Sequence, residues 1–182
     1  SHLKKVLNGE KKNTESSPIS PHKLLQQLAL LDLHSEPPVH TSEVTHERKL
    51  KKVGEQAGSN EGGLYQDEET GQEMYVKFYE NMDQGRMENL ANHIYRKLGI
   101  AAPESEILTV DRREAFASKI IDGHHRLSPE DLADDDSVKA GLVVDAFLAN
   151  WDVVGLFFDN IEEGADGRKY RIDNGGVFTF RA

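Results

Sequence analysis

The chain has 182 residues and a formal net charge of −10, with 37% hydrophobic and 30% charged residues. That length suits one domain or a small two-lobed unit. The acidic balance argues against a nonspecific binder of nucleic acid or of a membrane surface, because both need a basic face. The chain has no cysteine, which excludes disulfides, thiolate zinc sites and a cysteine nucleophile.

The longest apolar stretch, GLVVDAFLANWDVVGLFF, is interrupted by Asp145, Asn150 and Asp152. These polar residues indicate a buried core segment, so we expect no membrane span. The lack of cysteine fits a reducing compartment. We therefore expect a cytoplasmic protein, or one delivered into a host cytosol if it is an effector.

Residues 1–53 contain most of the prolines and few aromatic residues, which is typical of a flexible leader. Within it, Ser20 as N-cap and Pro21 at the first helical position predict a short amphipathic helix over about 20–33. Its apolar positions recur at helical spacing and are Leu24, Leu25, Leu28 and Leu31. This stripe must be buried either on the rest of the chain or on a partner, and the sequence leaves both open.

From about residue 54 the pattern becomes globular and predicts one domain over 54–182. The segment GLYQDEETGQEMYVKFYE predicts a hairpin with its turn at residues 67–71. The next segment, DQGRMENLANHIYRKLGI, predicts an amphipathic helix that ends before Gly99. The side chains that we expect on its buried face are Met87, Leu90, Ala91, Ile94 and Leu98.

The segments ESEILTVD and REAFASKII predict two strands around a turn. Ser128 and Pro129 indicate the start of a helix, and residues 135–150 predict the longest buried helix, with KYRIDN as a later short strand. No internal repeat is present. This order predicts an α+β arrangement rather than a doubly wound sheet.

A glycine-rich segment precedes the hairpin and is a candidate phosphate-binding loop. Gly58, Gly62 and Gly63 stand with Ser59 and Asn60 in GSNEGG. Backbone amides in such a loop can approach a phosphate closely because no Cβ intervenes. The same residues are also compatible with an ordinary loop.

Lys77 lies in the middle of the second hairpin strand. Strand alternation places it on one face with Tyr75 and Tyr79, and away from the apolar Val76. One hairpin after the glycine segment is where a phosphate-contacting lysine belongs. Glu88, early in the next helix, is the candidate carboxylate to pair with it. The alternatives are that Lys77 is an ordinary solvated strand lysine and that Glu88 is an ordinary acidic residue on the helix surface.

Three polar residues near the C-terminus form a pattern that phosphoryl transfer requires. Asp152 follows the apolar run, Asn160 comes eight residues later, and Asp173 precedes two glycines. One carboxylate would orient the acceptor hydroxyl, while an amide oxygen and a second carboxylate would hold Mg²⁺. Each residue alone is ambiguous, because Asp and Asn are common in turns.

These segments resemble the atypical kinases of the HipA-like and phosphatidylinositol 3/4-kinase-like group, of bacterial or phage-associated type. The resemblance covers residues 54–182 and rests on GGLYQDEETGQEMYVKFY, MENLANHIYRKLGIAAPE, VVDAFLANWDVVGLFFDNI and YRIDNGG. It implies a protein-kinase-like fold of two lobes, with a small antiparallel sheet in the first and a short helical second lobe. It also implies that Lys77 contacts ATP, that Asp152 is the catalytic-loop aspartate, and that Asn160 and Asp173 are the metal ligands.

The sequence departs from this family at three points. Asp152 is followed by Val153 and Val154 where the family has Arg and His, and the spacing from Asp152 to Asn160 is longer. Only residues 174–182 follow Asp173, where a kinase has more of its helical lobe. A truncated fragment, a minimal kinase and a pseudokinase therefore all stay open.

The leading hypothesis is an ATP-dependent phosphotransferase that uses Mg²⁺ and acts on Ser or Thr of a protein substrate. The alternatives are a lipid kinase or nucleotidyl transferase with the same site, and a pseudokinase or module that binds a nucleotide or a partner without turnover. The histidines have no metal-ligand spacing, and His124 and His125 are expected in a loop after a strand.

Overall fold

The computed structural model describes residues 47–56, 60–153 and 160–178. The expected helix at 20–33 and two residues of the glycine segment, Gly58 and Ser59, lie outside these ranges. No helix within the described ranges is long and apolar enough to cross a bilayer.

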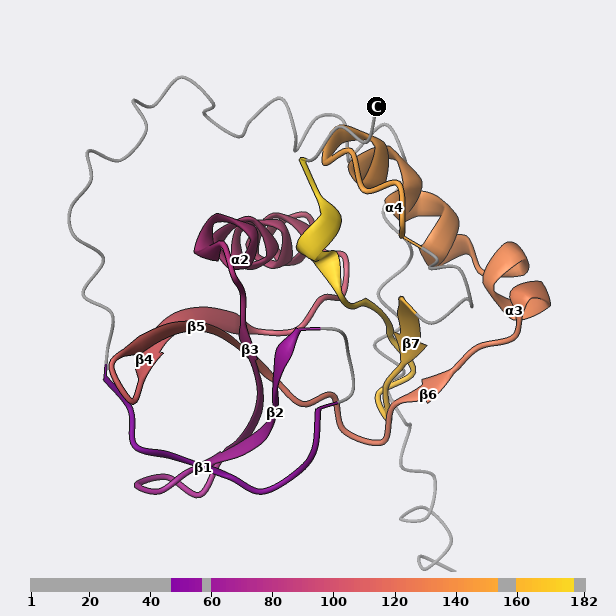
Figure 1. The fold of residues 1–182 in the computed structure, drawn as a ribbon. Helices are drawn as coiled ribbons and strands as arrows, with labels where there is room; N and C mark the ends of the chain where they lie inside the picture. Colours follow the sequence, from indigo (N-terminus) through magenta and orange to yellow (C-terminus); the bar gives the residue numbers. More distant parts are fainter. Residues whose placement is uncertain (1–46, 57–59, 154–159, 179–182) are drawn as a thin grey trace, which may run out of the picture.

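The first structural unit is an antiparallel sheet of five strands in the order β1-β2-β3-β5-β4 (Figure 1). The strands are β1 (Leu50–Lys52), β2 (Glu61–Asp67), β3 (Glu73–Phe78), β4 (Ser105–Val110) and β5 (Arg113–Lys119). The predicted hairpin is β2–β3, and the two later predicted strands are β4–β5. In the first turn Asp67 accepts hydrogen bonds from the backbone N–H groups of Glu69 and Thr70, both at 2.9 Å.

Strand β1 lies within the segment that we expected to be leader. It pairs with β2 from Leu50↔Asp67 to Lys52↔Tyr65, so the folded chain begins before Gly54. The polar strand has too few apolar residues to be recognised from its own pattern. Its backbone groups nevertheless complete the free edge of β2.

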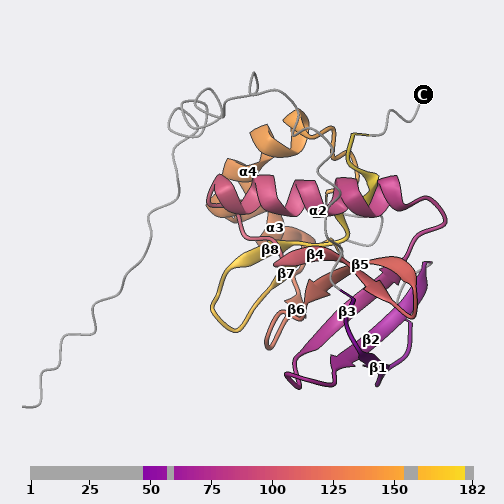
Figure 2. The same ribbon diagram turned by 90° about the vertical axis from the view of Figure 1, so that its left-hand side faces the viewer.

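Helix α2 (Met82–Lys97) follows β3 and contacts β4 and β5 (Figure 2). Asn81 caps its first turn by accepting from the N–H of Asp83 at 3.0 Å, and Gly99 ends it with a φ of 79°. The residues of the helix that are buried are Gly85, Glu88, Ala91, Asn92 and Tyr95.

The predicted inward face of this helix is therefore wrong in part. Ala91 and Leu98 are buried and Ile94 is half-buried, but Met87 is 36% exposed and Leu90 51% exposed. The helix is rotated so that its polar residues face the interior. This orientation is stable because Glu88, Asn92 and Tyr95 all find hydrogen-bond partners there.

The second structural unit combines two helices with a sheet of order β6-β7-β8. Its strands are β6 (His125–Arg126), β7 (Ile161–Glu163) and β8 (Lys169–Arg171). Its helices are α3 (Pro129–Asp134) and α4 (Asp136–Phe147), followed by the 3-10 turn η1 (Asn174–Gly176). Ser128 caps α3 and Asp135 caps α4 through their side chains, as their residue types predict. The described chain is thus a mixed α+β structure with antiparallel sheets.

An apolar cluster joins α2 to α4 and to the residue after η1. Its members are Ala91, Tyr95, Leu98, Ala102, Val144, Leu148 and Val177. A second cluster lies along the five-stranded sheet and includes Met74, Val76 and Leu108. The first cluster fixes η1 beside α2, which is the contact that builds the site (Figure 1).

Candidate active site

Lys77 stands at the centre of the site, between carboxylates from two distant segments. Its Nζ lies 3.0 Å from Oε1 of Glu88 on α2 and 2.8 Å from Oδ1 of Asp173, directly before η1. The lysine side chain is 14% exposed, and its Nζ lies 5.6 Å from the centroid of the Phe116 ring. The structure thus brings together three residues that the sequence predicts for one site.

The charge of Lys77 is held in place by these neighbours. Burial by itself lowers the pKa of the ammonium, but the carboxylates of Glu88 and Asp173 more than offset this, and the net pKa is raised above its usual value. Lys77 is therefore a fixed positive charge inside a partly closed site. The ammonium thus stays protonated, and the two carboxylates beside it offset its charge.

Tyr79 belongs to the same site, although no role was predicted for it from the sequence. Its hydroxyl donates a short hydrogen bond to Oε2 of Glu88, and both side chains are buried. Burial and the Glu88 charge raise the pKa of Tyr79 far above its usual value, so the hydroxyl stays a donor. Strand alternation with Lys77 was the signal that could have identified it.

Gly175 allows this approach, since a Cβ there would lie 2.7 Å from the Tyr79 oxygen. A glycine at position 175 is thus required by the close contact between η1 and Tyr79, the residue that follows β3. Asp173 itself has a left-handed backbone, with φ 52° and ψ 49°. Its side chain is 60% exposed and so remains accessible to a ligand.

A network of buried amides ties Asp173 to α2. The Nδ2 of Asn174, the next residue, donates to Oδ1 of Asn92 at 2.8 Å. Asn150 donates to Oδ1 of Asn174 and to the Tyr95 hydroxyl, both at 3.0 Å. These contacts join the end of α4, η1 and α2, so that the element carrying Glu88 and the element carrying Asp173 are held together.

Asn160 lies beside Asp173 through a backbone pair. The N–H of Ile172 donates to the Asn160 carbonyl oxygen at 2.9 Å. The side chain of Asn160 donates to the carbonyl oxygen of Asp152 at 2.6 Å. Asp152 itself is exposed, and this contact with Asn160 uses its backbone oxygen and not its carboxylate.

The glycine segment differs from the expected loop. Asn60 is half-buried directly before β2, whereas Gly62 and Gly63 lie within that strand, paired with Lys77 and Val76. Pairing continues to Glu61↔Phe78 because the two backbones can approach closely here. A Cβ on Gly62 would lie 2.0 Å from the Val76 carbonyl oxygen.

Four of the predicted site residues line one cavity of about 320 Å³. Lys77, Glu88, Asn160 and Asp173 all line it, together with apolar side chains from other segments. The apolar part of the lining comes from Pro103, Phe116, Ile120, Ile121 and Ile172. A cavity with a few polar groups and apolar walls is typical of a small-molecule site.

His124 and Glu162 also line this cavity. The Nδ1 of His124 lies 2.5 Å from Oε2 of Glu162 on β7. The expected loop position is correct for His124 but wrong for His125, which begins β6. The contact of His124 with Glu162 could not be predicted, because the two residues lie far apart in the sequence. A larger cavity of about 510 Å³ shares Ile120 and Ile121 but not Lys77 or Asp173, so we place the site in the smaller one.

The oxygen groups of Asn160 and Asp173 fit a magnesium ion. Mg²⁺ keeps several waters and is held by one or two protein oxygens together with substrate phosphates. Asp173 is accessible and lines the same cavity as Asn160. Among the described residues there is no group of three or more His, Asp or Glu side chains that would form an all-protein metal cage.

Comparison with solved structures finds two kinases, both at low sequence identity. No family model and no curated protein match the sequence. The structure is similar to the proinflammatory kinase CtkA from Helicobacter pylori, with 15% identity and a TM-score of 0.49, covering 76% of this chain and 62% of that one. It is also similar to choline kinase LicA from Streptococcus pneumoniae, with 15% identity and a TM-score of 0.37, covering 70% of this chain and 63% of that one.

The chain therefore spans less than two thirds of the length of each of these two structures. Likeness at this level assigns no activity or substrate. The function proposed below depends instead on the geometry of Lys77, Glu88 and Asp173.

Proposed function

We propose that the chain binds Mg-ATP in the cavity around Lys77 and is a phosphotransferase of the protein-kinase-like, HipA-related class. The observation that carries this proposal is the position of the Lys77 ammonium between Glu88 and Asp173, at 3.0 and 2.8 Å. A strand lysine, a helix glutamate and an aspartate beside glycines are the parts that a kinase uses to hold nucleotide phosphates.

Each group has a distinct task in this proposal. Glu88 and Tyr79 orient the lysine from the buried side, which leaves its ammonium directed at the cavity. Asn160 and Asp173 would hold Mg²⁺, which neutralises charge on the phosphates. Because Asp173 now contacts Lys77 directly, nucleotide binding requires that this ion pair separate and that both groups turn to the ligand.

The apolar lining suits the base of the nucleotide. Phe116, Ile121 and Ile172 provide surfaces against which a planar ring can be buried. The polar groups of the same cavity gather around Lys77. A ligand with a flat apolar end and an anionic end matches both parts.

Asp152 is the proposed group that orients the acceptor hydroxyl, which we place on a Ser or Thr of a protein substrate. Its carbonyl oxygen is bound by Asn160, so the residue lies next to the proposed metal ligand. Its carboxylate is exposed and is thus available to a large acceptor. A lipid kinase or nucleotidyl transferase would use the same constellation.

A nucleotide-binding module without turnover is the second candidate. It is favoured by Val153, which follows Asp152 in place of a basic residue. Without an adjacent cation, the aspartate has less help in stabilising the transferred charge.

Intact-mass analysis after incubation with Mg-ATP tests the proposal and separates these outcomes. A phosphotransferase that modifies itself gains the mass of a phosphoryl group, whereas a nucleotidyl transferase gains that of an adenylyl group. Titration calorimetry with Mg-ATP on the same sample, with Lys77→Met and the exposed-lysine control Lys51→Met, measures binding. Binding without a mass change supports the second candidate, a nucleotide-binding module without turnover. No Mg-ATP binding by the folded wild type overturns the proposal.

A further inference from the structure

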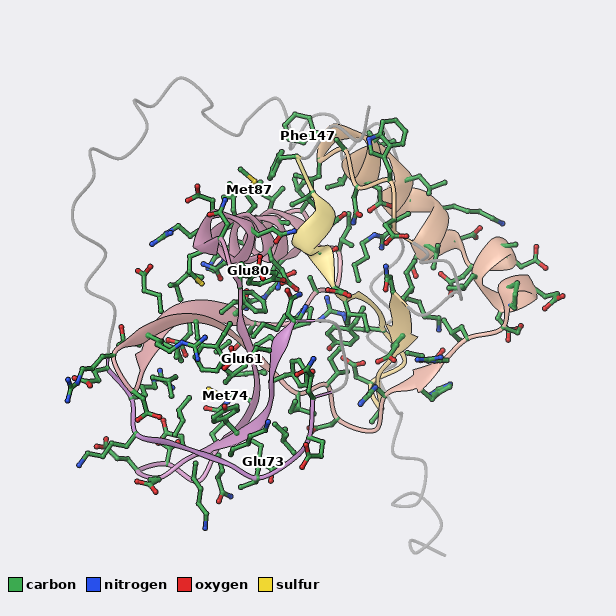
Figure 3. All side chains as sticks on the ribbon, viewed as in Figure 1. Glu61, Glu73, Met74, Glu80, Met87 and Phe147 are labelled. Atoms are coloured by element: carbon green, nitrogen blue, oxygen red, sulfur yellow. The ribbon has the colours of Figure 1, made fainter. Side chains whose placement is uncertain are left out.

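Helix α2 has an outer face that is apolar and uncovered among the described residues. Met87 and Leu90 are 36% and 51% exposed, and Ile94 beside them is only half-buried. These three residues lie at i, i+3 and i+7, which is one face of a helix. Figure 3 shows Met87 on the side of α2 turned away from the five-stranded sheet.

Further exposed apolar side chains come from the end of α4 and from the segment after η1. Val177 and Leu148 belong to the same apolar cluster as Ala91 of α2. Their sequence neighbours Phe178 and Phe147 are exposed, at 36% and 47%. Figure 3 shows Phe147 on the same side of the molecule as Met87. Several exposed apolar residues gathered beside one core cluster indicate an interaction surface.

The first described residue is linked to the start of α2 through the edge of the five-stranded sheet. Glu47 forms a bridge with Thr109, and the N–H of Arg48 donates to the Thr109 carbonyl at 3.0 Å. Thr109 pairs with Glu114 across β4 and β5. Glu114 in turn binds Arg86 of α2 at 2.9 Å. A short series of direct contacts thus leads from the first described residue to the residue beside Met87.

The preceding segment has a stripe that could cover the surface. Leu24, Leu28 and Leu31 recur at helical spacing within residues 20–33. Residues 32–46 separate this stripe from Glu47, and at 3.3–3.6 Å per residue they can span roughly 50 Å. Because Glu47 lies near the first turns of α2, such a linker is long enough for docking within one chain.

We propose that residues 20–33 of the same chain dock on the outer face of α2, with the leucine stripe against Met87, Leu90 and Ile94. The short tether favours this occupant, because a segment linked to the surface is present at a high effective concentration. A second copy of the chain or a different protein would have to compete with it.

Docking at this place would act on the candidate active site. The opposite face of α2 carries Glu88, which binds Lys77, and Asn92, which holds the segment after Asp173 through Asn174. A brace on the outer face restricts rotation of α2 and so keeps Glu88 directed at Lys77. This regulatory consequence rests on the proposed function, whereas docking itself does not.

Disulfide trapping tests docking directly, since the chain has no cysteine of its own. The full-length double variant Leu28→Cys with Leu90→Cys is oxidised mildly without nucleotide and is analysed by intact mass. The control is Leu28→Cys with Glu69→Cys, whose second site is exposed in the β2–β3 turn. That turn lies at the far end of β3, about six residues or roughly 20 Å from the start of α2.

We expect an intramolecular disulfide with Leu90→Cys that forms at least ten times faster than in the control. Equal rates in the two variants overturn the proposal. A disulfide that links two chains, and whose yield rises with protein concentration, also overturns it and assigns the surface to a second copy.

Hydrogen exchange gives a second measurement that needs no oxidation. Leu28→Asp should speed exchange of the amides at 86–94 several-fold, because a charge cannot be buried on the apolar face. Gln26→Asp makes the same charge change on the opposite side of the leucine stripe and should leave exchange unchanged. Identical exchange in both variants contradicts docking, whatever the result with Mg-ATP.

Discussion

Arg171 and Asp145 form a buried two-pronged ion pair that joins β8 to α4. The Nε and Nη2 atoms of Arg171 donate to the two carboxylate oxygens of Asp145 at 2.7 and 2.9 Å. The Tyr95 hydroxyl donates to the same carboxylate at 2.8 Å. Gly141 makes room for the guanidinium, since a Cβ there would lie 2.0 Å from Nη2. Strand β8, which leads to Asp173, is thus fixed to α4, and through Asp145 it is linked to Tyr95 on α2.

We predict that Asp145→Ala lowers the free energy of unfolding by about 3–5 kcal/mol, because it leaves the buried Arg171 without its counter-charge. Denaturant unfolding measures this effect, with Glu68→Ala in the exposed β2–β3 turn as the control. A loss no larger than that of the control would show that the pair does not stabilise the fold.

Tyr79→Phe should weaken the site without removing it. The change deletes the donor to Glu88 but leaves the Lys77–Glu88 pair, so we expect a loss of about 1.5–3 kcal/mol of stability, as for a hydrogen bond to a charged group. We also expect weaker Mg-ATP binding. Tyr170→Phe removes a hydroxyl bound to the exposed Asp166 and is the matched control. Unfolding curves and titration calorimetry on both variants make the comparison, and equal losses would contradict a special role for Tyr79.

Alkaline pH should destabilise the fold through its buried tyrosines. Burial and the Asp145 carboxylate raise the pKa of Tyr95 above the ordinary value of 10.0. The folded chain therefore retains this proton to higher pH than the unfolded chain. This contribution to stability is fully present below about pH 10 and is lost as the pH rises through the folded pKa.

Measured unfolding free energies between pH 9 and 11 should thus fall more steeply in the wild type than in Tyr95→Phe, which has no proton to lose at this position. Parallel curves for the two proteins would exclude a contribution from Tyr95 to the alkaline slope.

Local sequence patterns predicted which helices and strands form better than they predicted which face of an element is buried. The β2–β3 hairpin, the position of Lys77 in its second strand and the start of α3 at Ser128 are confirmed, because each depends on neighbouring residues. The predicted buried face of α2 was wrong in part, because Tyr95 and Asn92 bind Asp145 and Asn174, which come much later in the chain. A helix pattern contains no information about such distant partners.

The candidate site shows the same difference between features set by neighbouring residues and features set by distant ones. Residue order placed Lys77, Glu88 and Asp173 in one site, and the ion pairs of Lys77 join them. Gly62 was expected in a loop and lies in a strand, since strand pairing here depends on how closely β3 approaches. Strand alternation puts Tyr79 on the face of Lys77, but its hydrogen bond to Glu88 depends on where α2 lies, which the sequence alone does not provide.

Asp173 and Asp152 should differ in which step they affect. Asp173→Ala removes a proposed metal ligand and a partner of Lys77, so we expect Mg-ATP affinity to fall at least tenfold. Asp152→Ala should leave affinity nearly unchanged, because the Asn160 contact uses the backbone oxygen of that residue, but it should abolish phosphoryl transfer.

Titration calorimetry measures binding in both variants, and intact mass after incubation with Mg-ATP measures transfer. Asp166→Ala is a control, since this exposed aspartate lies in the turn before β8 and outside the cavity lining around Lys77. Equal Mg-ATP affinity in the wild type and Asp173→Ala would contradict the metal assignment. Full transfer by Asp152→Ala would instead mean that another group orients the acceptor hydroxyl, because loss of the carboxylate would then leave the reacting geometry intact.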